Sequence, residues 1–98
     1  MRGFLDNLVF ELRLTLQRDP KTSDKLVQVE WIFESYPDQL WFVIKIGDMT
    51  HREPVSISDI REWVTAPRYY YYDIERLKRE VLDNARLKWY EHQRGAVK

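Results

Sequence analysis

"LVQVEWIFESYPDQLWFVIKI", residues 26–46, decides the fold, because two strand-like apolar runs flank a turn. The intervening "YPDQ" places Pro37 and Asp38 at the two central positions, where proline fixes φ and aspartate is well tolerated. These residues predict a β-hairpin that is closed by Tyr36 and Gln39.

The closure of this turn also sets the cross-strand partners of the hairpin. One face is apolar, and its predicted pairs are Phe33 with Phe42, Trp31 with Ile44, and Val29 with Ile46. The opposite face pairs Glu30 with Lys45. A slip of one residue would lose both the apolar face and this opposite-charge pair, so we expect a well-specified register.

Residues 10–17, "FELRLTLQ", alternate apolar and polar side chains, which is typical of a half-buried strand. Leucines also recur at the three- and four-residue spacing of a helix, namely Leu5, Leu8, Leu12 and Leu16. Antiparallel pairing of residues 10–17 with the next strand places Arg13 opposite Glu30, and Lys45 completes a ladder of alternating charge. We therefore favour a strand, while a helix over residues 4–17 stays open.

The stretch "PVSISDIREWV", residues 54–64, carries the signals of a helix start. Ser56 is a suitable N-cap, and Asp59 follows it three residues later. Val55 and Ile60 are placed to contact each other across the first turn. We predict a short helix here.

A long C-terminal helix is predicted to end near Arg94, with Gly95 available as a left-handed C-cap. Its apolar stripe consists of Tyr70, Ile74, Leu77, Val81 and Ala85, with Trp89 at the edge. We expect this stripe to lie across the apolar face of the sheet. The chain is thus predicted to be a single small α+β domain over residues 1–98, with a three-stranded antiparallel β-meander packed by a short helix and a long C-terminal helix.

The composition fits such a domain, with 44% hydrophobic and 33% charged residues. The absence of cysteine excludes disulfide bonds and thiolate metal sites. No apolar run approaches the roughly 20 residues that cross a bilayer, and the start "MRGFLDNLVF" lacks the apolar length of a signal peptide. We expect a cytoplasmic protein without a membrane partner.

Four consecutive tyrosines, Tyr69–Tyr72, precede the charged part of the C-terminal helix. If they are helical they point around the axis at about 100° intervals, and if they are extended they alternate between two faces. Both arrangements leave phenols that the core does not need. Together with arginines of one helix face they form a candidate partner-binding surface, which consists of Tyr69, Tyr72, Arg76, Arg79, Arg86 and Tyr90. A solvated helix face with ordinary ion pairs would look similar.

A second candidate patch lies on the polar face of the hairpin. Ile32, Trp41 and Val43 should cluster there, although their neighbours are polar. Either the N-terminal residues Phe4, Leu5 and Leu8 fold back and cover them, or they form an exposed partner site.

The sequence contains few residues that are typical of catalytic or metal-binding sites. His51 and His92 are the only histidines, and neither belongs to a metal-binding pattern. The run "GDMTHREPVS", residues 47–56, contains possible nucleophile, base and acid side chains, but a polar loop between a strand and a helix has the same composition. We expect no catalytic site, no metal and no cofactor.

These observations predict a non-enzymatic protein-binding module, such as an adaptor, regulator or inhibitor of a larger protein. Self-association into a homodimer is its simplest form. The alternative is a small DNA- or RNA-binding protein with a helix-turn-helix-like C-terminal half, because residues 68–98 contain eight basic and five acidic side chains. Sixteen basic and sixteen acidic residues cancel over the whole chain, so the long-range field of a dedicated nucleic-acid binder is absent.

Overall fold

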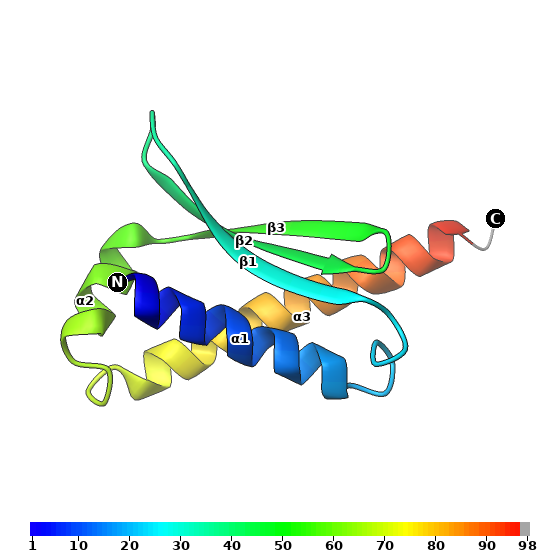
Figure 1. Cartoon of the computed structure of the whole chain (residues 1–98), viewed down its shortest axis with the longest axis horizontal. Helices are drawn as coiled ribbons and strands as arrows, with labels where there is room; N and C mark the ends of the chain where they lie inside the picture. Colours follow the sequence, from blue (N-terminus) through cyan, green and yellow to red (C-terminus); the bar gives the residue numbers. More distant parts are fainter. Residues whose placement is uncertain (97–98) are drawn as a thin grey trace.

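The computed structural model describes residues 1–96 as one antiparallel sheet packed against helices (Figure 1). The elements in chain order are α1 (Arg2–Arg18), β1 (Val27–Glu34), β2 (Gln39–Ile46), β3 (Met49–Val55), α2 (Ile57–Thr65) and α3 (Tyr71–Ala96). The strands follow the order β1-β2-β3, so the sheet is a meander. The predicted α+β class, with three antiparallel strands, a short helix and a long C-terminal helix, is confirmed.

The prediction of a strand over residues 10–17 is wrong, because these residues belong to α1. The buried side chains are those at helical spacing, namely Leu5, Leu8, Leu12 and Leu16. Phe10, which the strand would bury beside Leu12, is 49% exposed instead. The helix buries four leucines against the sheet, and this gain outweighs the alternating pattern.

The third strand is β3, which lies within the stretch expected to be a polar loop. A two-residue turn, Gly47 and Asp48, joins it to β2. Gly47 has a φ of 61°, a left-handed conformation that glycine adopts without a Cβ clash. His51 and Glu53 point to the helix side of the sheet, where they bond to each other at 2.9 Å. The strand is therefore polar in sequence even though one face of it is covered.

The β1–β2 hairpin forms, but its register differs from the prediction by two residues. Glu34 pairs with Gln39, so four residues make the loop, with a cis peptide bond between Tyr36 and Pro37. A shift of two residues keeps every side chain on its predicted face, since the strand period is two. The predicted apolar face is therefore preserved although its pairs change.

The predicted charge ladder does not exist. Glu30 lies opposite Val43, and Lys45 lies opposite Gln28. Arg13 belongs to α1 rather than to a strand. Both registers bury the same apolar face, so the four-residue loop closed by Glu34 and Gln39 decides between them, and one exposed ion pair contributes too little to outweigh it.

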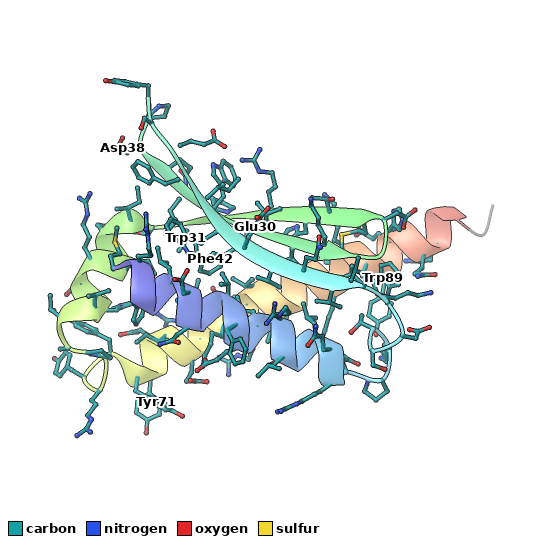
Figure 2. The ribbon with its side chains drawn as sticks, viewed as in Figure 1. Glu30, Trp31, Asp38, Phe42, Tyr71 and Trp89 are labelled. Atoms are coloured by element: carbon teal, nitrogen blue, oxygen red, sulfur yellow. The ribbon has the colours of Figure 1, made fainter. Side chains whose placement is uncertain are left out.

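The core lies between one face of the sheet, called the inner face here, and helices α1 and α3 (Figure 1). Phe42, Ile44 and Ile46 of β2 are almost fully buried there. Figure 2 shows Phe42 directed toward the helices. Trp31 packs against the same core, and its indole N–H donates to the Asp6 carboxylate of α1 at 2.8 Å. These contacts fix α1 beneath β1.

Ser56 caps α2 as predicted, because its hydroxyl accepts from the backbone N–H of Asp59 at 3.2 Å. The apolar stripe of α3 is also confirmed: Ile74, Val81, Ala85 and Trp89 are buried, and Tyr70 and Leu77 pack against them. The predicted C-cap at Gly95 is wrong, since α3 extends to Ala96.

The segment between α1 and β1 is held by two side chains. Thr22 is buried, and its hydroxyl donates to the carbonyl oxygen of Leu16. Asp19 accepts from the backbone N–H of Lys21 and from the Arg86 guanidinium of α3 at 3.0 Å. These bonds, the backbone one foremost, lower the pKa of Asp19 below its ordinary value although partial burial opposes the charge. The loop is thereby tied to α3.

The assignment of α1 predicts unequal effects of two truncations. Leu16→Ala should lower the free energy of unfolding by about 2 to 5 kcal/mol, because it opens a cavity in the core. Phe10→Ala should cost less than about 1 kcal/mol, because its ring is half exposed. Urea denaturation of both variants measures the difference. Equal large losses would support the strand, in which both side chains face the core.

Candidate protein interfaces

The first candidate interface is the face of α3 predicted from the tyrosine and arginine pattern. It is called the α3 surface here and consists of Tyr69, Tyr72, Arg76, Arg79, Arg86 and Tyr90. Tyr69, in the turn before the helix, is 81% exposed, and Tyr72 in the first turn is 84% exposed. The helix begins at Tyr71, so the tyrosines are neither all helical nor all extended. Two large phenols are therefore presented to solvent at one end of α3.

Intramolecular contacts engage part of the α3 surface. Arg76 forms an ion pair with Asp73 at 3.2 Å. Arg86 pairs with Asp19 at 3.0 Å, and Lys21 lies 5.1 Å from the ring centroid of Tyr90. These last two contacts bind α3 to the loop after α1. The structure therefore divides the predicted residues into two groups. Tyr69 and Tyr72 are exposed at one end of the surface, and Arg86 and Tyr90 contact the loop after α1 at the other end.

Arg79 lies between these two ends and forms no ion pair among residues 1–96. It lines a groove between α1 and α3 with a volume of about 440 Å³. Arg18 of α1 lines the same groove and is likewise without an ion pair in the described chain. Leu14 and Leu82 supply half-buried apolar surface beside them. The groove thus combines two unpaired cations with an apolar lining.

The remaining charges of the groove neutralise one another. Lys78 bonds to Glu11 of α1 at 2.7 Å and to Glu75 at 2.6 Å. Partial burial disfavours the charged ammonium, but the two carboxylates outweigh this effect, so the pKa of Lys78 is raised. The pattern of α3 alone could not predict the groove, since half of it comes from α1. A helical α1 would have placed Glu11, Thr15 and Arg18 on one face.

The second candidate interface is the face of the sheet that points away from α1 and α3, called the outer face here. Ile32, Trp41 and Val43 lie on it, as predicted. Leu5 and Leu8 were expected as their cover, but they pack on the inner face instead. Ile32 is 36% exposed, whereas Val43 is only 6% exposed beneath its neighbours.

Charged side chains surround this apolar strip. Arg52 of β3 lies over the Trp41 ring, 4.7 Å from its centroid, and pairs with Glu34 of β1. The indole Nε1 of Trp41 is buried and has no acceptor among the described residues. At the β1 edge, Arg13 reaches from α1 into a hollow that Glu30, Val43 and Lys45 also line. The outer face is therefore amphipathic, with no described helix lying over it.

The polar residues of the run 47–56 do not converge on one site in the structure. Thr50 lies on the outer face and His51 on the inner face. The Ser56 hydroxyl is engaged in capping α2 and lies 3.0 Å from the hydroxyl of Ser58. Glu53 accepts from Asn84 of α3 at 3.0 Å, so the pair that it forms with His51 joins β3 to α3. Residues 1–96 contain no group of three His, Asp or Glu side chains that could hold a metal ion.

His92 is also paired with a carboxylate, that of Asp48 at 2.8 Å. This hydrogen bond is the main reason that the pKa of Asp48 lies below its ordinary value. The contact joins the end of α3 to the β2–β3 turn, where Trp89 packs 3.8 Å from the position that a Cβ of Gly47 would occupy. His92 thus connects α3 to the β2–β3 turn, whereas His51 bonds within β3 to Glu53, which accepts from Asn84 of α3.

Tyr70, the second tyrosine of the cluster, has a structural role. The Tyr70 hydroxyl donates to the Glu62 carboxylate of α2 at 2.6 Å, which raises the pKa of Tyr70 to about 12. The folded chain therefore holds this proton more tightly than the unfolded chain does. The stabilisation should be complete below pH 10 and disappear as the pH rises toward 12.

An alkaline titration followed by tyrosinate absorbance should show a delayed component with a midpoint near pH 12, which belongs to Tyr70. Glu62→Gln should return the pKa of Tyr70 toward 10, because the negative charge is lost. Glu80→Gln, at an exposed position of α3, is the control and should leave the titration unchanged. A delayed tyrosine that persists in Glu62→Gln would contradict this assignment.

Comparisons of the chain with protein-family models, curated proteins and solved structures give no match. Within residues 1–96, none of the helices is both long and apolar enough to cross a membrane. The interfaces must therefore be interpreted from their own geometry and chemistry.

Proposed function

We propose that this chain is a non-enzymatic protein-binding module whose partner docks on the α3 surface and the adjoining groove. One observation carries the proposal: the exposed phenols of Tyr69 and Tyr72 lie at one end of a helix face that continues to Arg79. The guanidinium of Arg79 has no ion-pair partner among residues 1–96. Tyrosine and arginine are the residues most enriched where binding energy is concentrated.

The groove indicates the chemistry of the partner. Arg18 and Arg79 can each donate two parallel hydrogen bonds to a carboxylate. Leu14 and Leu82 offer apolar contact between them. A segment with acidic side chains on either side of a large apolar side chain would satisfy both features.

A protein partner suits this surface better than a nucleic acid does. The cations of the groove are interspersed with Glu11 and Glu75, and Arg86 is paired with Asp19. Carboxylates at these places would repel a phosphate backbone. The net charge of the chain is also zero, so electrostatic attraction of DNA or RNA would be weak.

The absence of catalysis is part of the same proposal. The polar groups that could serve as base and acid, His51 and Glu53, are occupied in joining β3 to α3. The possible nucleophile Ser56 caps a helix. Packing and capping therefore account for the polar residues of this region.

The test is a selection of short displayed peptides against the purified protein. We expect enriched peptides that contain Asp or Glu around a large apolar residue. Tyr72→Ala combined with Arg79→Ala should weaken their binding at least about tenfold, because both side chains are exposed and neither builds the core. Fluorescence anisotropy with a selected peptide measures this change.

The matched control combines Tyr36→Ala with Arg61→Ala, which removes one exposed tyrosine and one exposed arginine elsewhere. This variant should bind like the parent. Mixed-sequence duplex DNA is tested in parallel at roughly 50 and 200 mM salt, a range in which phosphate contacts weaken measurably. Salt-sensitive DNA binding that is lost in the Tyr72/Arg79 variant would replace the protein partner with a nucleic acid. Unchanged peptide binding in that variant would refute the α3 surface.

A further inference from the structure

The strand register arranges the outer face in rows that run across the sheet. Ile32, Trp41 and Pro54 form one row, and Glu30, Val43 and Arg52 form the next. In the second row the acidic Glu30 lies on β1 and the basic Arg52 lies on β3, with the apolar Val43 between them. The face is therefore polarised across its strands.

This face is open on the side away from the core. Helices α1 and α3 contact the strands from the inner side, and Figure 2 shows Glu30 on the opposite side of the sheet from Phe42. Glu30, Arg52 and Pro54 are all exposed. An amphipathic sheet face of this kind can pack against another sheet about 10 Å away.

A second copy of the same face is complementary to it when a two-fold axis runs parallel to β2. Such an axis places β1 of one copy over β3 of the other, and β2 over β2. Glu30 then meets Arg52 of the second copy, and the reciprocal pair forms by symmetry. Val43 lies on the axis between these two ion pairs, but its neighbours already cover it, so it adds little contact.

In the neighbouring row, too, the β1 residue of one copy meets the β3 residue of the other. Ile32 meets Pro54 of the second copy, and the two Trp41 rings meet near the axis. Indole rings carry a large apolar area and are enriched at the centre of interfaces. Lys45 of β2 lies on the axis in the next row, opposite Lys45 of the second copy, and its long side chain can turn outward so that the two ammonium groups stay apart in water.

The charges of this face favour one orientation of the two-fold axis over the other. A two-fold axis perpendicular to the strands would set β1 over β1 and place the carboxylates of Glu30 and Glu34 against each other. Like charges in contact oppose such an arrangement. Only the axis parallel to the strands brings opposite charges together in this row.

We infer that the outer face is a homodimer interface, in which two copies pack face to face about an axis parallel to β2. Arg52 of each copy leaves its place over the Trp41 ring and its pairing with Glu34, and it binds the Glu30 carboxylate of the second copy. An exposed ion pair and a surface cation–π contact each contribute little, so this exchange costs little free energy. This dimer uses a surface separate from the α3 surface and goes beyond the proposed function.

The test is sedimentation equilibrium of charge-reversed variants over a wide concentration series. The parent should show a monomer–dimer equilibrium. Glu30→Arg alone and Arg52→Glu alone should each weaken the dimer at least about tenfold, because each brings like charges together twice. An equimolar mixture of the two variants should recover the dimer as a heterodimer, since both contacts then join opposite charges.

Two matched reversals on α3, Glu80→Arg and Arg94→Glu, change the net charge equally and should leave the dimer intact. Circular dichroism confirms that each variant is folded. If a reversal unfolds the chain, Ile32→Glu gives an independent disruption through the apolar row, and it should produce a monomer.

Three outcomes overturn the inference: a parent that stays monomeric throughout, a dimer that the outer-face variants do not affect, or a mixture that does not recover. A dimer lost only with Tyr72→Ala and Arg79→Ala would assign self-association to the α3 surface instead. Peptide binding that fails while the charge-swap mixture recovers would remove the proposed function and leave this interface standing.

Discussion

The burial of one sheet face beneath two helices is the constraint on which the rest of this structure depends. A three-stranded sheet needs a covered apolar face to be stable, and α1 and α3 share that covering role here. α1 supplies four leucines, and α3 supplies the stripe that ends at Trp89. Because each helix covers only part of the sheet, their side-by-side placement creates the groove in which Arg18 and Arg79 lie.

Local signals in the sequence were sufficient for part of this fold. The face of each hairpin residue, the cap at Ser56 and the buried stripe of α3 all followed from periodicity or from neighbouring residues. The identity of α1 did not follow, since Leu12 and Leu16 are buried in both a helix and a strand at that position. The exposure of Phe10 and the half-buried position of Leu14 separate the two, and exposure depends on tertiary packing.

The third strand could not be predicted from the sequence for a different reason. Its inner positions are filled by His51 and Glu53, which are satisfied by each other and by Asn84 of α3. A covered strand with polar inner residues does not show the alternation of apolar and polar residues that marks most strands. The dipeptide of Gly47 and Asp48 after an apolar run was the available signal, because such pairs are favoured in two-residue hairpins.

The candidate interfaces, like the fold, could be predicted only in part from the sequence. The exposure of Tyr69 and Tyr72 followed from helix geometry, because a stripe of one face cannot bury four consecutive phenols. The engagement of Arg86 and Tyr90 by Asp19 and Lys21 could not be predicted, since those partners are distant in sequence. The α3 surface and the outer face lie on opposite sides of the sheet, so occupation of one leaves the other accessible.

β1 is an edge of the sheet, and its backbone donors and acceptors on one side are not paired with another described strand. Edges of this kind recruit further strands and lead to aggregation unless charge protects them. Glu30 and Glu34 supply that charge, because alignment of a second β1 along this edge would gather carboxylates. The carboxylates of β1 therefore disfavour the addition of further strands at this edge of the sheet at neutral pH.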